Sequence, residues 1–126
     1  MNDGSQFEDY EQEVVSFDYY QHQSKRTAGT HEQPLDATLN WTLGLTGEAG
    51  EFANLVKKAI YHNHGFDYSE MVSELGDVLW YLSQLCTSLG IDLDMVADQN
   101  LKKLRKRYPN GFNFEDSINR EENRGS

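Results

Sequence analysis

The sequence predicts an all-α domain of four helices, and three observations lead to that class. The two prolines, Pro34 and Pro109, leave the long stretch between them free of a residue that breaks helices. Apolar residues recur at steps of three and four in four segments, and no segment alternates as a strand would. A chain of 126 residues has room for one core and not two, so we expect a single domain over residues 1–126, with its helical core at about 5–112.

The first predicted helix begins at a capping box, Ser5 followed three residues later by Glu8, and runs to about Gln23. One face of this helix is given by residues at steps of three and four: Phe7, Tyr10, Val14, Phe17 and Gln21. Other aromatic residues of this segment lie around the rest of the helix, which favours burial on several sides and hence oligomerisation. The polar stretch from Lys25 to Pro34 predicts a loop.

The second predicted helix starts near Leu35 or Asp36 and ends at about Tyr61. Its apolar stripe consists of Leu45, Ala49, Phe52, Val56 and Ile60. Three glycines also fall in this segment, at Gly44, Gly47 and Gly50. They indicate either a side of the helix that another backbone approaches closely or a break in the helix, and the sequence leaves both open.

The third predicted helix follows a loop marked by Asn63 and Gly65, and Asp67 with Glu70 repeats the capping pattern. Its stripe is the most regular in the chain, and Gly90 ends it; the stripe residues are Met71, Leu75, Val78, Leu82, Leu85 and Leu89.

Asp92 is the predicted cap of a fourth helix that runs through Tyr108, before Pro109 and Gly111. We expect an inward face made of Ala97, Leu101, Leu104 and Tyr108. The segment from about 115 to 126 is polar and predicts a frayed tail.

Composition excludes several functions. The chain has 21 acidic and 11 basic side chains and a net charge of -10, which argues against a binder of DNA or RNA because such binding depends on basic residues. Cys86 is the single cysteine, so neither an intramolecular disulfide nor a cysteine-based zinc site is expected. No signal peptide or membrane-spanning segment is apparent, and we expect a cytoplasmic protein.

Two pairs of carboxylates are the candidate metal-binding residues. Glu48 and Glu51 lie on the second helix, and Glu74 and Asp77 on the third, each pair three residues apart and therefore on one side of its helix. Each pair borders an apolar stripe, so packing of the two stripes gathers four carboxylates. Such a group needs protons or cations, and oxygen ligands without His or Cys favour Mg²⁺ or Mn²⁺. A single acidic pair is more often structural, and it is the repetition that favours a metal site.

Asn100, Lys103 and Arg107 form a second stripe, on the fourth helix. Opposite a carboxylate–metal cluster, this stripe suits a polyphosphate ligand. The alternative is that the basic residues complement the helix dipole, which applies most to Lys102, Arg105 and Lys106.

These residues resemble a known family. The motifs are Gly44-Leu-Thr-Gly-Glu48-Ala-Gly-Glu51, Lys57-Lys58, Glu74-Leu-Gly-Asp77-Val-Leu-Trp-Tyr81, Asn100-Leu-Lys-Lys103 and Arg107-Tyr-Pro. Together they resemble the MazG-like all-α nucleoside triphosphate pyrophosphohydrolases over roughly residues 35 to 112.

The resemblance implies a four-helix bundle core, a homodimer or homotetramer, and Mg²⁺- or Mn²⁺-dependent hydrolysis of (deoxy)nucleoside triphosphates to the monophosphate and pyrophosphate. It implies Glu48, Glu51, Glu74 and Asp77 as metal ligands, with Glu48 or Glu51 activating water. It also implies phosphate contacts from Lys57, Lys58, Tyr81, Asn100, Lys103 and Arg107.

Base recognition is the least determined part of the site. Candidates are Asn40, Trp41, Tyr10, Val14 and Asp18, although Trp41 equally suits a core or interface position. On resemblance alone, the expected substrate is dGTP. The competing hypotheses are a non-catalytic helical adaptor and a hydrolase of the same fold that acts on another pyrophosphate, such as phosphoribosyl-ATP.

Overall fold

The computed structural model describes residues 13–30 and 34–120, and these residues form helices without strands. The order is α1 (Phe17–Ser24), the short 3₁₀ helix η2 (Lys25–Thr27), α2 (Pro34–Tyr61), α3 (Tyr68–Ser88), α4 (Leu93–Arg107) and α5 (Phe114–Ile118). The all-α prediction is therefore confirmed for this part of the chain. None of its helices combines the length and apolar character that crossing a membrane requires.

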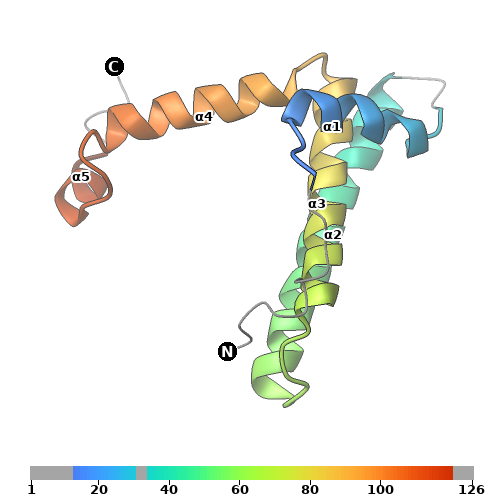
Figure 1. Cartoon of the computed structure of the whole chain (residues 1–126), viewed down its shortest axis with the longest axis horizontal. Coiled ribbons are helices and arrows are strands. Elements are labelled where there is room, and N and C mark those ends of the chain that lie inside the picture. The colour runs from blue at the N-terminus through green and yellow to red at the C-terminus, as the bar shows by residue number, and fades with distance from the viewer. Residues whose placement is uncertain (1–12, 31–33, 121–126) are drawn as a thin grey trace.

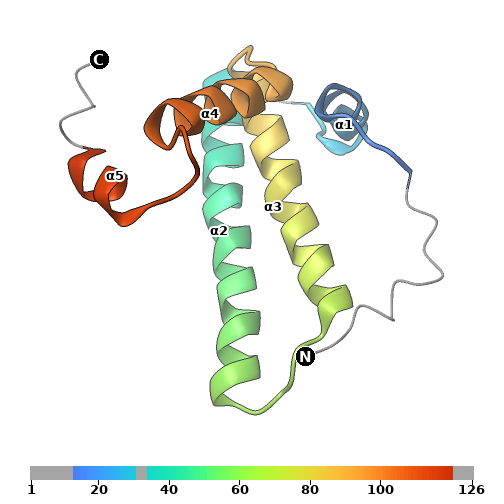
Figure 2. The same ribbon diagram turned by 60° about the vertical axis from the view of Figure 1, so that its left-hand side comes forward.

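The body of the molecule is an antiparallel hairpin of α2 and α3, which lie side by side (Figures 1 and 2). α2 continues through all three glycines, so the alternative of a break is wrong. The glycines do not form one row of close approach either. A Cβ on Gly44 would overlap the ring of Tyr81, whereas Gly47 and Gly50 face open space. Of these three glycines, Gly44 is therefore the one that is approached closely, and the group that approaches it is the Tyr81 side chain and not a backbone.

Both ends of α3 follow the predicted signals. The Asp67 carboxylate accepts a hydrogen bond from the backbone N–H of Glu70 at 3.1 Å, which satisfies a donor in the first turn. Just beyond the helix, Gly90 has φ +68°, a left-handed conformation that glycine adopts without steric cost. The chain then enters α4. Asp92 occupies its N-cap position, but its side chain makes no capping hydrogen bond.

α1 is shorter than predicted. The expected cap at Ser5 and Glu8, together with Phe7 and Tyr10, lies outside the described residues. Residues 13–16 are not helical, and α1 begins at Phe17, so a helix through Val14 is wrong. The physical reason is local: the Ser16 hydroxyl accepts a hydrogen bond from the backbone N–H of Tyr19, and two β-branched valines precede it. Val14 is fully exposed.

Polar side chains dominate the buried positions where α1 meets α3 and the start of α4. In the described residues the buried apolar side chains are Trp41, Cys86 and Leu93, and the buried polar ones are Gln21, Ser24, Ser83 and Gln84. Every buried side-chain nitrogen and oxygen of these residues has a hydrogen-bond partner. The contact is therefore stabilised by specific hydrogen bonds more than by apolar area.

Gln21 makes the most bonds in this contact. Its amide nitrogen donates to the Thr87 hydroxyl at 3.2 Å and to the Ile91 carbonyl at 2.9 Å. Its amide oxygen accepts from the backbone N–H of Leu93 at 2.8 Å, which satisfies the first turn of α4. One side chain of α1 thus fixes the turn between α3 and α4.

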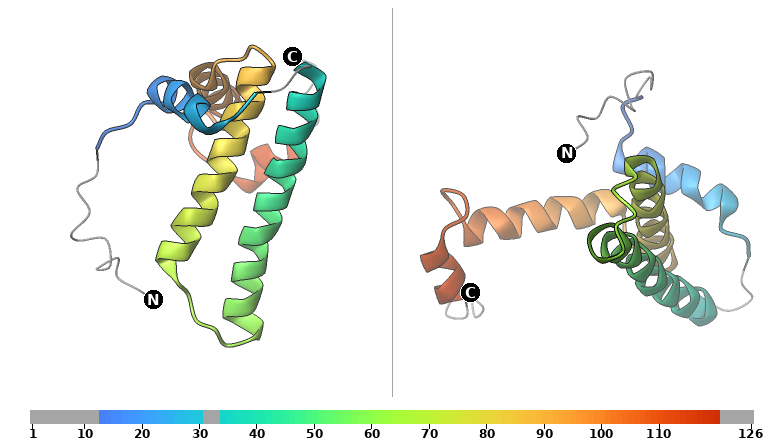
Figure 3. Two further views of the ribbon diagram at one scale, coloured as in Figure 1. Left: turned by 90° about the vertical axis from the view of Figure 1, so that its right-hand side faces the viewer. Right: turned by 90° about the horizontal axis from the view of Figure 1, so that it is seen from below.

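α4 projects from the end of the hairpin at which α3 ends, on the side opposite α1 (Figures 1 and 3). It packs against α1 at its start. On its predicted inward face, Leu101 is 51% exposed and Leu104 is 38% exposed. The prediction that this face is buried is therefore wrong for the single chain, in which the described helices do not close a four-helix bundle. The reason is that, within residues 13–30 and 34–120, no other helix runs along the length of α4.

α5 was not predicted from the sequence. The Asn113 side chain accepts a hydrogen bond from the backbone N–H of Asp116 at 2.7 Å and so begins this short helix. The expectation of a frayed tail from residue 115 is wrong as far as Ile118, and residues 121–126 lie outside the description. A helix of five residues is too short for its periodicity to be recognised in a sequence.

Candidate metal and phosphate site

Three of the four predicted carboxylates meet on the α2–α3 hairpin. Glu48 comes from α2 and Glu74 and Asp77 from α3, and each offers an oxygen within 4.8 Å of the others. Glu74 and Asp77 lie three residues apart and project from one side of α3. The packing of the two helices then brings Glu48 opposite them. The sequence pattern thus becomes a cluster because the hairpin aligns the acidic turns of two helices.

The electrostatics of this cluster favour a cation or a proton. The pKa of the Glu74 carboxyl is raised above its ordinary value, first by partial burial and next by the charge of Glu48 and a hydrogen bond with it. The charges of Asp77 and Glu51 raise it further. Crowded carboxylates repel each other unless positive charge enters the group. A divalent ion bound among these carboxylates would therefore relieve their mutual repulsion.

The residues of the cluster fit a hard divalent cation. All three donors are carboxylate oxygens, without His or Cys, as Mg²⁺ and Mn²⁺ prefer. Oxygen ligands of Mg²⁺ lie at about 2.1 Å, so two ligands on opposite sides of the ion are about 4.2 Å apart. Separations of up to 4.8 Å need only a small adjustment of the side chains. Glu51 stands outside the group of three, is exposed, and lies one turn along α2 from Glu48.

Tyr20 is a neighbour of the cluster that was not assigned to the site from the sequence. Partial burial and then the charge of Asp77 raise the pKa of its phenol. Tyr20 belongs to α1, and α1 packs against α3. No spacing in the sequence links it to Asp77, because the electrostatic influence of Asp77 on Tyr20 depends on how two distant helices pack.

Trp41 lies in the core of the hairpin, the alternative that the sequence left open. It is 7% exposed and contacts the ring of Trp80 edge-on at 5.3 Å. Tyr81, at 6.0 Å from Trp41, is half-buried and lies about one turn beyond Asp77 on α3. Tyr81 is thus adjacent to the carboxylates, whereas stacking of Trp41 on a base stays a prediction. Asn40 is exposed beside it.

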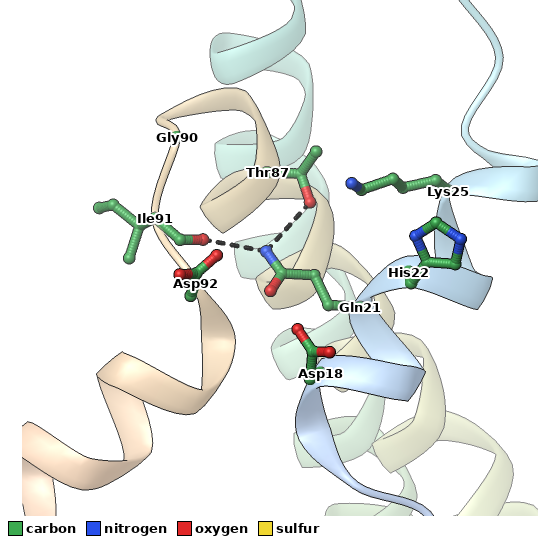
Figure 4. A pocket seen from close by; sticks show the side chains of 8 residues that line it. All are labelled: Asp18, Gln21, His22, Lys25, Thr87, Gly90, Ile91 and Asp92. Atoms are coloured by element: carbon green, nitrogen blue, oxygen red, sulfur yellow. Dashed lines mark hydrogen bonds between the residues drawn. The ribbon is translucent and has the colours of Figure 1, made fainter.

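Asp18 lines a separate hollow of about 250 Å³ between α1 and the α3–α4 turn (Figure 4). Its other lining residues are Gln21, His22, Lys25, Thr87, Gly90, Ile91 and Asp92. Thr87 lies ten residues beyond Asp77 on α3, or about 15 Å along the helix. Asp18 therefore lies at this hollow and not among the clustered carboxylates, Val14 is fully exposed, and Tyr10 is outside the description.

The predicted lysines of α2 lie nearer the loop end of the hairpin. Lys58 is half-buried and lines a hollow of about 230 Å³ with residues of the α2–α3 loop and the start of α3, while Lys57 is exposed. The hollow includes Glu70, one helical turn before Glu74. Lys58 is therefore on the same flank of the hairpin as the cluster, about two to three turns from Glu48 along α2.

The polar-basic stripe of α4 is not brought to the carboxylates in the single chain. Asn100 and Lys103 are exposed and Arg107 is half-buried. These residues belong to the turns of α4 that extend away from the hairpin (Figure 1), whereas the carboxylates lie within α2 and α3. The two halves of the predicted site are thus separate in one copy of the chain.

Comparison with known proteins identifies the family. The model of the MazG nucleotide pyrophosphohydrolase domain matches residues 37–112, which include all four carboxylates and the α4 stripe. The Gene 37 protein of Mycobacterium phage L5 is 43% identical over 74 residues, which cover 56% of this chain and 65% of that protein. The chain thus spans somewhat less than two thirds of this curated relative. No solved structure matches this chain. Because the family model matches more than half of the chain and includes the carboxylate cluster, this protein belongs to the MazG nucleotide pyrophosphohydrolase family.

Proposed function

We propose that this protein hydrolyses nucleoside triphosphates, with deoxynucleotides and dGTP as the preferred substrates, to the monophosphate and pyrophosphate. The observation that carries the proposal is the cluster of Glu48, Glu74 and Asp77 across two packed helices, in a chain of the MazG family. A cluster of this kind fits the metal complex of a polyphosphate. The single, buried cysteine is in keeping with a cytoplasmic protein.

Glu48, Glu74 and Asp77 would hold the divalent ion, Mg²⁺ or Mn²⁺. When bound, the ion neutralises charge on the phosphate oxygens and makes water a better nucleophile. The raised pKa of Glu74 means that a proton would compete with the ion for this carboxylate, and ionised Glu74 would offer its oxygens to the ion together with those of Glu48.

Glu51 is the residue best suited to act as the general base. It is exposed, lies one turn from Glu48, and stands outside the group of three, so its carboxylate is available to accept a proton. In the proposed step, a water oxygen bonds to the α-phosphorus and its proton passes to Glu51. The bond from the α-phosphorus to the bridging oxygen breaks, and pyrophosphate leaves with that electron pair.

The side chains around the cluster have separate proposed roles. Lys57 or Lys58 and Tyr81 contact the phosphates from the hairpin, and Tyr20 adds a phenol close to Asp77. Asn40 and Trp41 remain the candidates on α2 for the base, together with Asp18 and Val14 near α1. Asn100, Lys103 and Arg107 remain the proposed phosphate contacts from α4, although α4 does not bring them to the cluster in the single chain.

The test is incubation with each of the four dNTPs and NTPs, with Mg²⁺ or Mn²⁺, followed by separation of the phosphate products. Release of pyrophosphate and a nucleoside monophosphate is the expected result. Orthophosphate alone, or no turnover of any nucleotide, contradicts the proposal. Phosphoribosyl-ATP in the same panel distinguishes the alternative hydrolase, and no turnover together with no metal-induced stabilisation indicates the adaptor.

Glu51→Gln tests the assignment of the base. We expect kcat to fall by about 10²–10⁴-fold, because the amide cannot accept the proton of the attacking water. Glu70→Gln is the matched control, since it makes the same change to another exposed glutamate, one turn before Glu74 on α3. Full activity of Glu51→Gln would remove this assignment even if the reaction itself stands.

A further inference from the structure

The starting observation is a pair of histidines in the loop that joins α2 to α3. His62 and His64 stand on either side of Asn63, and both side chains are exposed. The loop lies at the end of the hairpin opposite α1 and α4 (Figure 2). The centroids of the two imidazole rings are 6.2 Å apart, and the ring planes are tilted by 59°. The loop therefore holds two nitrogen ligands close together, outside the site described above.

The separation of the rings suits a single metal ion. A zinc–nitrogen bond is about 2.1 Å long and a ring nitrogen lies about 1.2 Å from the ring centroid, so two imidazoles on one ion have centroids about 5.4 to 6.6 Å apart. The observed 6.2 Å falls within this range. Rotation of the two side chains is then enough to turn a nitrogen of each ring toward a shared ion.

The backbone that carries the two rings is fixed by the end of α2. The N–H of His62 donates to the Lys58 carbonyl at 3.0 Å, and the N–H of His64 donates to the same carbonyl at 3.3 Å. Between them, Asn63 has φ +55°, a left-handed conformation that Asn adopts more readily than most residues. Because the backbone has its shape before an ion binds, binding costs less conformational freedom.

The charges around the pair favour a cation. His64 lines the hollow of about 230 Å³ beside the loop, together with the carboxylates of Asp67 and Glu70 and the ammonium group of Lys58. Lys58 opposes a cation, and the two carboxylates outnumber it. An ion at the histidine pair would therefore sit at the rim of a hollow with more negative than positive groups, where water can take its other coordination positions.

The ligands of the pair differ in kind from those of the carboxylate cluster. Imidazole nitrogen suits Zn²⁺, whereas carboxylate oxygens alone suit Mg²⁺ and Mn²⁺. The group of three carboxylates contains no histidine. Glu48 lies about 20 Å along α2 from Tyr61, the last residue of that helix and the neighbour of His62. The hairpin thus presents two sets of ligands, at different places, to two classes of ion.

We propose that His62 and His64 bind one Zn²⁺ ion in each chain, at a site separate from the metal site of the proposed reaction. Each imidazole coordinates in its neutral form through one ring nitrogen, and water completes the coordination. The bound ion joins two points of the α2–α3 loop and should make this end of the hairpin more resistant to local opening. The site goes beyond the proposed function and does not depend on it.

The test counts zinc ions by calorimetric titration at about pH 7.5, where ordinary imidazole is mostly neutral. We expect His62→Gln combined with His64→Gln to bind one Zn²⁺ ion fewer per chain than the unaltered protein. His22→Gln is the matched control, because it makes the same change to an exposed histidine of α1 and should leave the number of ions unchanged. Circular dichroism checks that each variant keeps its helix content.

A parallel titration with Mn²⁺ separates the histidine pair from the carboxylate cluster. Mn²⁺ prefers oxygen ligands, so the double histidine variant should bind Mn²⁺ with the affinity of the unaltered chain. Glu74→Gln should show the opposite pattern, since it weakens Mn²⁺ binding at the cluster and keeps the zinc ion of the loop.

The outcomes are distinct. Equal numbers of zinc ions on the double variant and on the unaltered chain overturn the proposal. It is also overturned if His22→Gln loses the same ion, or if one zinc ion is bound for every two chains, which indicates a bridge between copies. If the chain hydrolyses no nucleotide while the double variant still loses one zinc ion, the proposed function fails and the histidine site stands.

Discussion

The junction of α1 with α3 buries polar side chains, whereas the projecting α4 leaves apolar side chains exposed. At the junction Ser83 and Gln84 are almost completely inaccessible, and the Gln84 amide donates to the Ser24 hydroxyl at 2.8 Å. On α4 the leucines of the predicted inward face are exposed. The comparison teaches that the described residues pair all of their buried polar side chains while they leave apolar surface uncovered.

This difference has a physical basis. A buried polar group without a partner costs about 1–3 kcal/mol, so a polar contact must be complete wherever it forms. Exposed leucines carry a smaller cost each, and another chain can remove that cost. The junction is therefore fully packed within the described residues, whereas the same residues leave the leucines of α4 exposed.

We expect the largest loss of stability from Gln21→Leu, which removes the hydrogen bonds that Gln21 makes at the junction of α1 with α3 and α4. The leucine leaves the Leu93 N–H and the Ile91 carbonyl without the partners they have in the folded chain. At about 1–3 kcal/mol for each unsatisfied group, we expect the free energy of unfolding to fall by about 3 kcal/mol. Urea denaturation at one fixed protein concentration measures it.

His22→Leu is the control for this change, because His22 is the exposed neighbour of Gln21 on α1. Its unfolding free energy should stay within about 0.5 kcal/mol of the unaltered value. An unchanged midpoint for Gln21→Leu would mean that the hydrogen bonds of the junction do not hold α1 and α4 in place.

A smaller effect is expected at the close approach inside the hairpin. Gly44→Ala puts a Cβ into the ring of Tyr81, and overpacking of this kind costs about 1–3 kcal/mol. The gain in helix propensity, about 1 kcal/mol, offsets part of that cost. We expect a net loss of about 1 kcal/mol in thermal or urea unfolding.

Gly76→Ala provides the comparison, since a Cβ at Gly76 meets nothing within 4 Å. There the propensity gain stands alone, and stability should rise by up to about 1 kcal/mol. If both substitutions stabilise the protein equally, Tyr81 does not press on Gly44 in solution.

The smallest expected effect is a dependence on pH of the Tm shift caused by Mn²⁺, and it arises from Glu74. Its pKa in the folded chain lies above the ordinary 4.5, so its contribution to the stability of the metal-free protein is full below that value and is lost as pH rises through the raised pKa. A divalent ion binds the ionised form. The shift in Tm caused by Mn²⁺ should therefore grow as pH rises from about 5 to about 7.5.

Glu74→Gln should remove this dependence, because its side chain stays neutral at every pH. The Tm of the variant should respond weakly to Mn²⁺ across the whole pH range. A shift with Mn²⁺ that stays constant with pH in the unaltered chain would show that Glu74 is not a ligand whose proton competes with the ion.

The sequence alone determined the local features of this protein. Periodicity and capping residues predicted α2 and α3 close to their observed ends, because a helix depends on neighbours three and four positions away. The same spacing predicted which carboxylates share a side of each helix, and three of the four do meet. The family motifs follow from these local patterns as well, and the family model matches over them.

The tertiary structure decided everything that depends on contacts between distant segments. It placed Tyr20 near Asp77, buried Ser83 and Gln84 in place of part of the regular apolar stripe of α3, and directed α4 away from the hairpin. An apolar stripe in a sequence states that a helix face needs cover, but it does not say what covers it. The reason is physical: burial is a property of two surfaces, and the sequence of a helix describes only one of them.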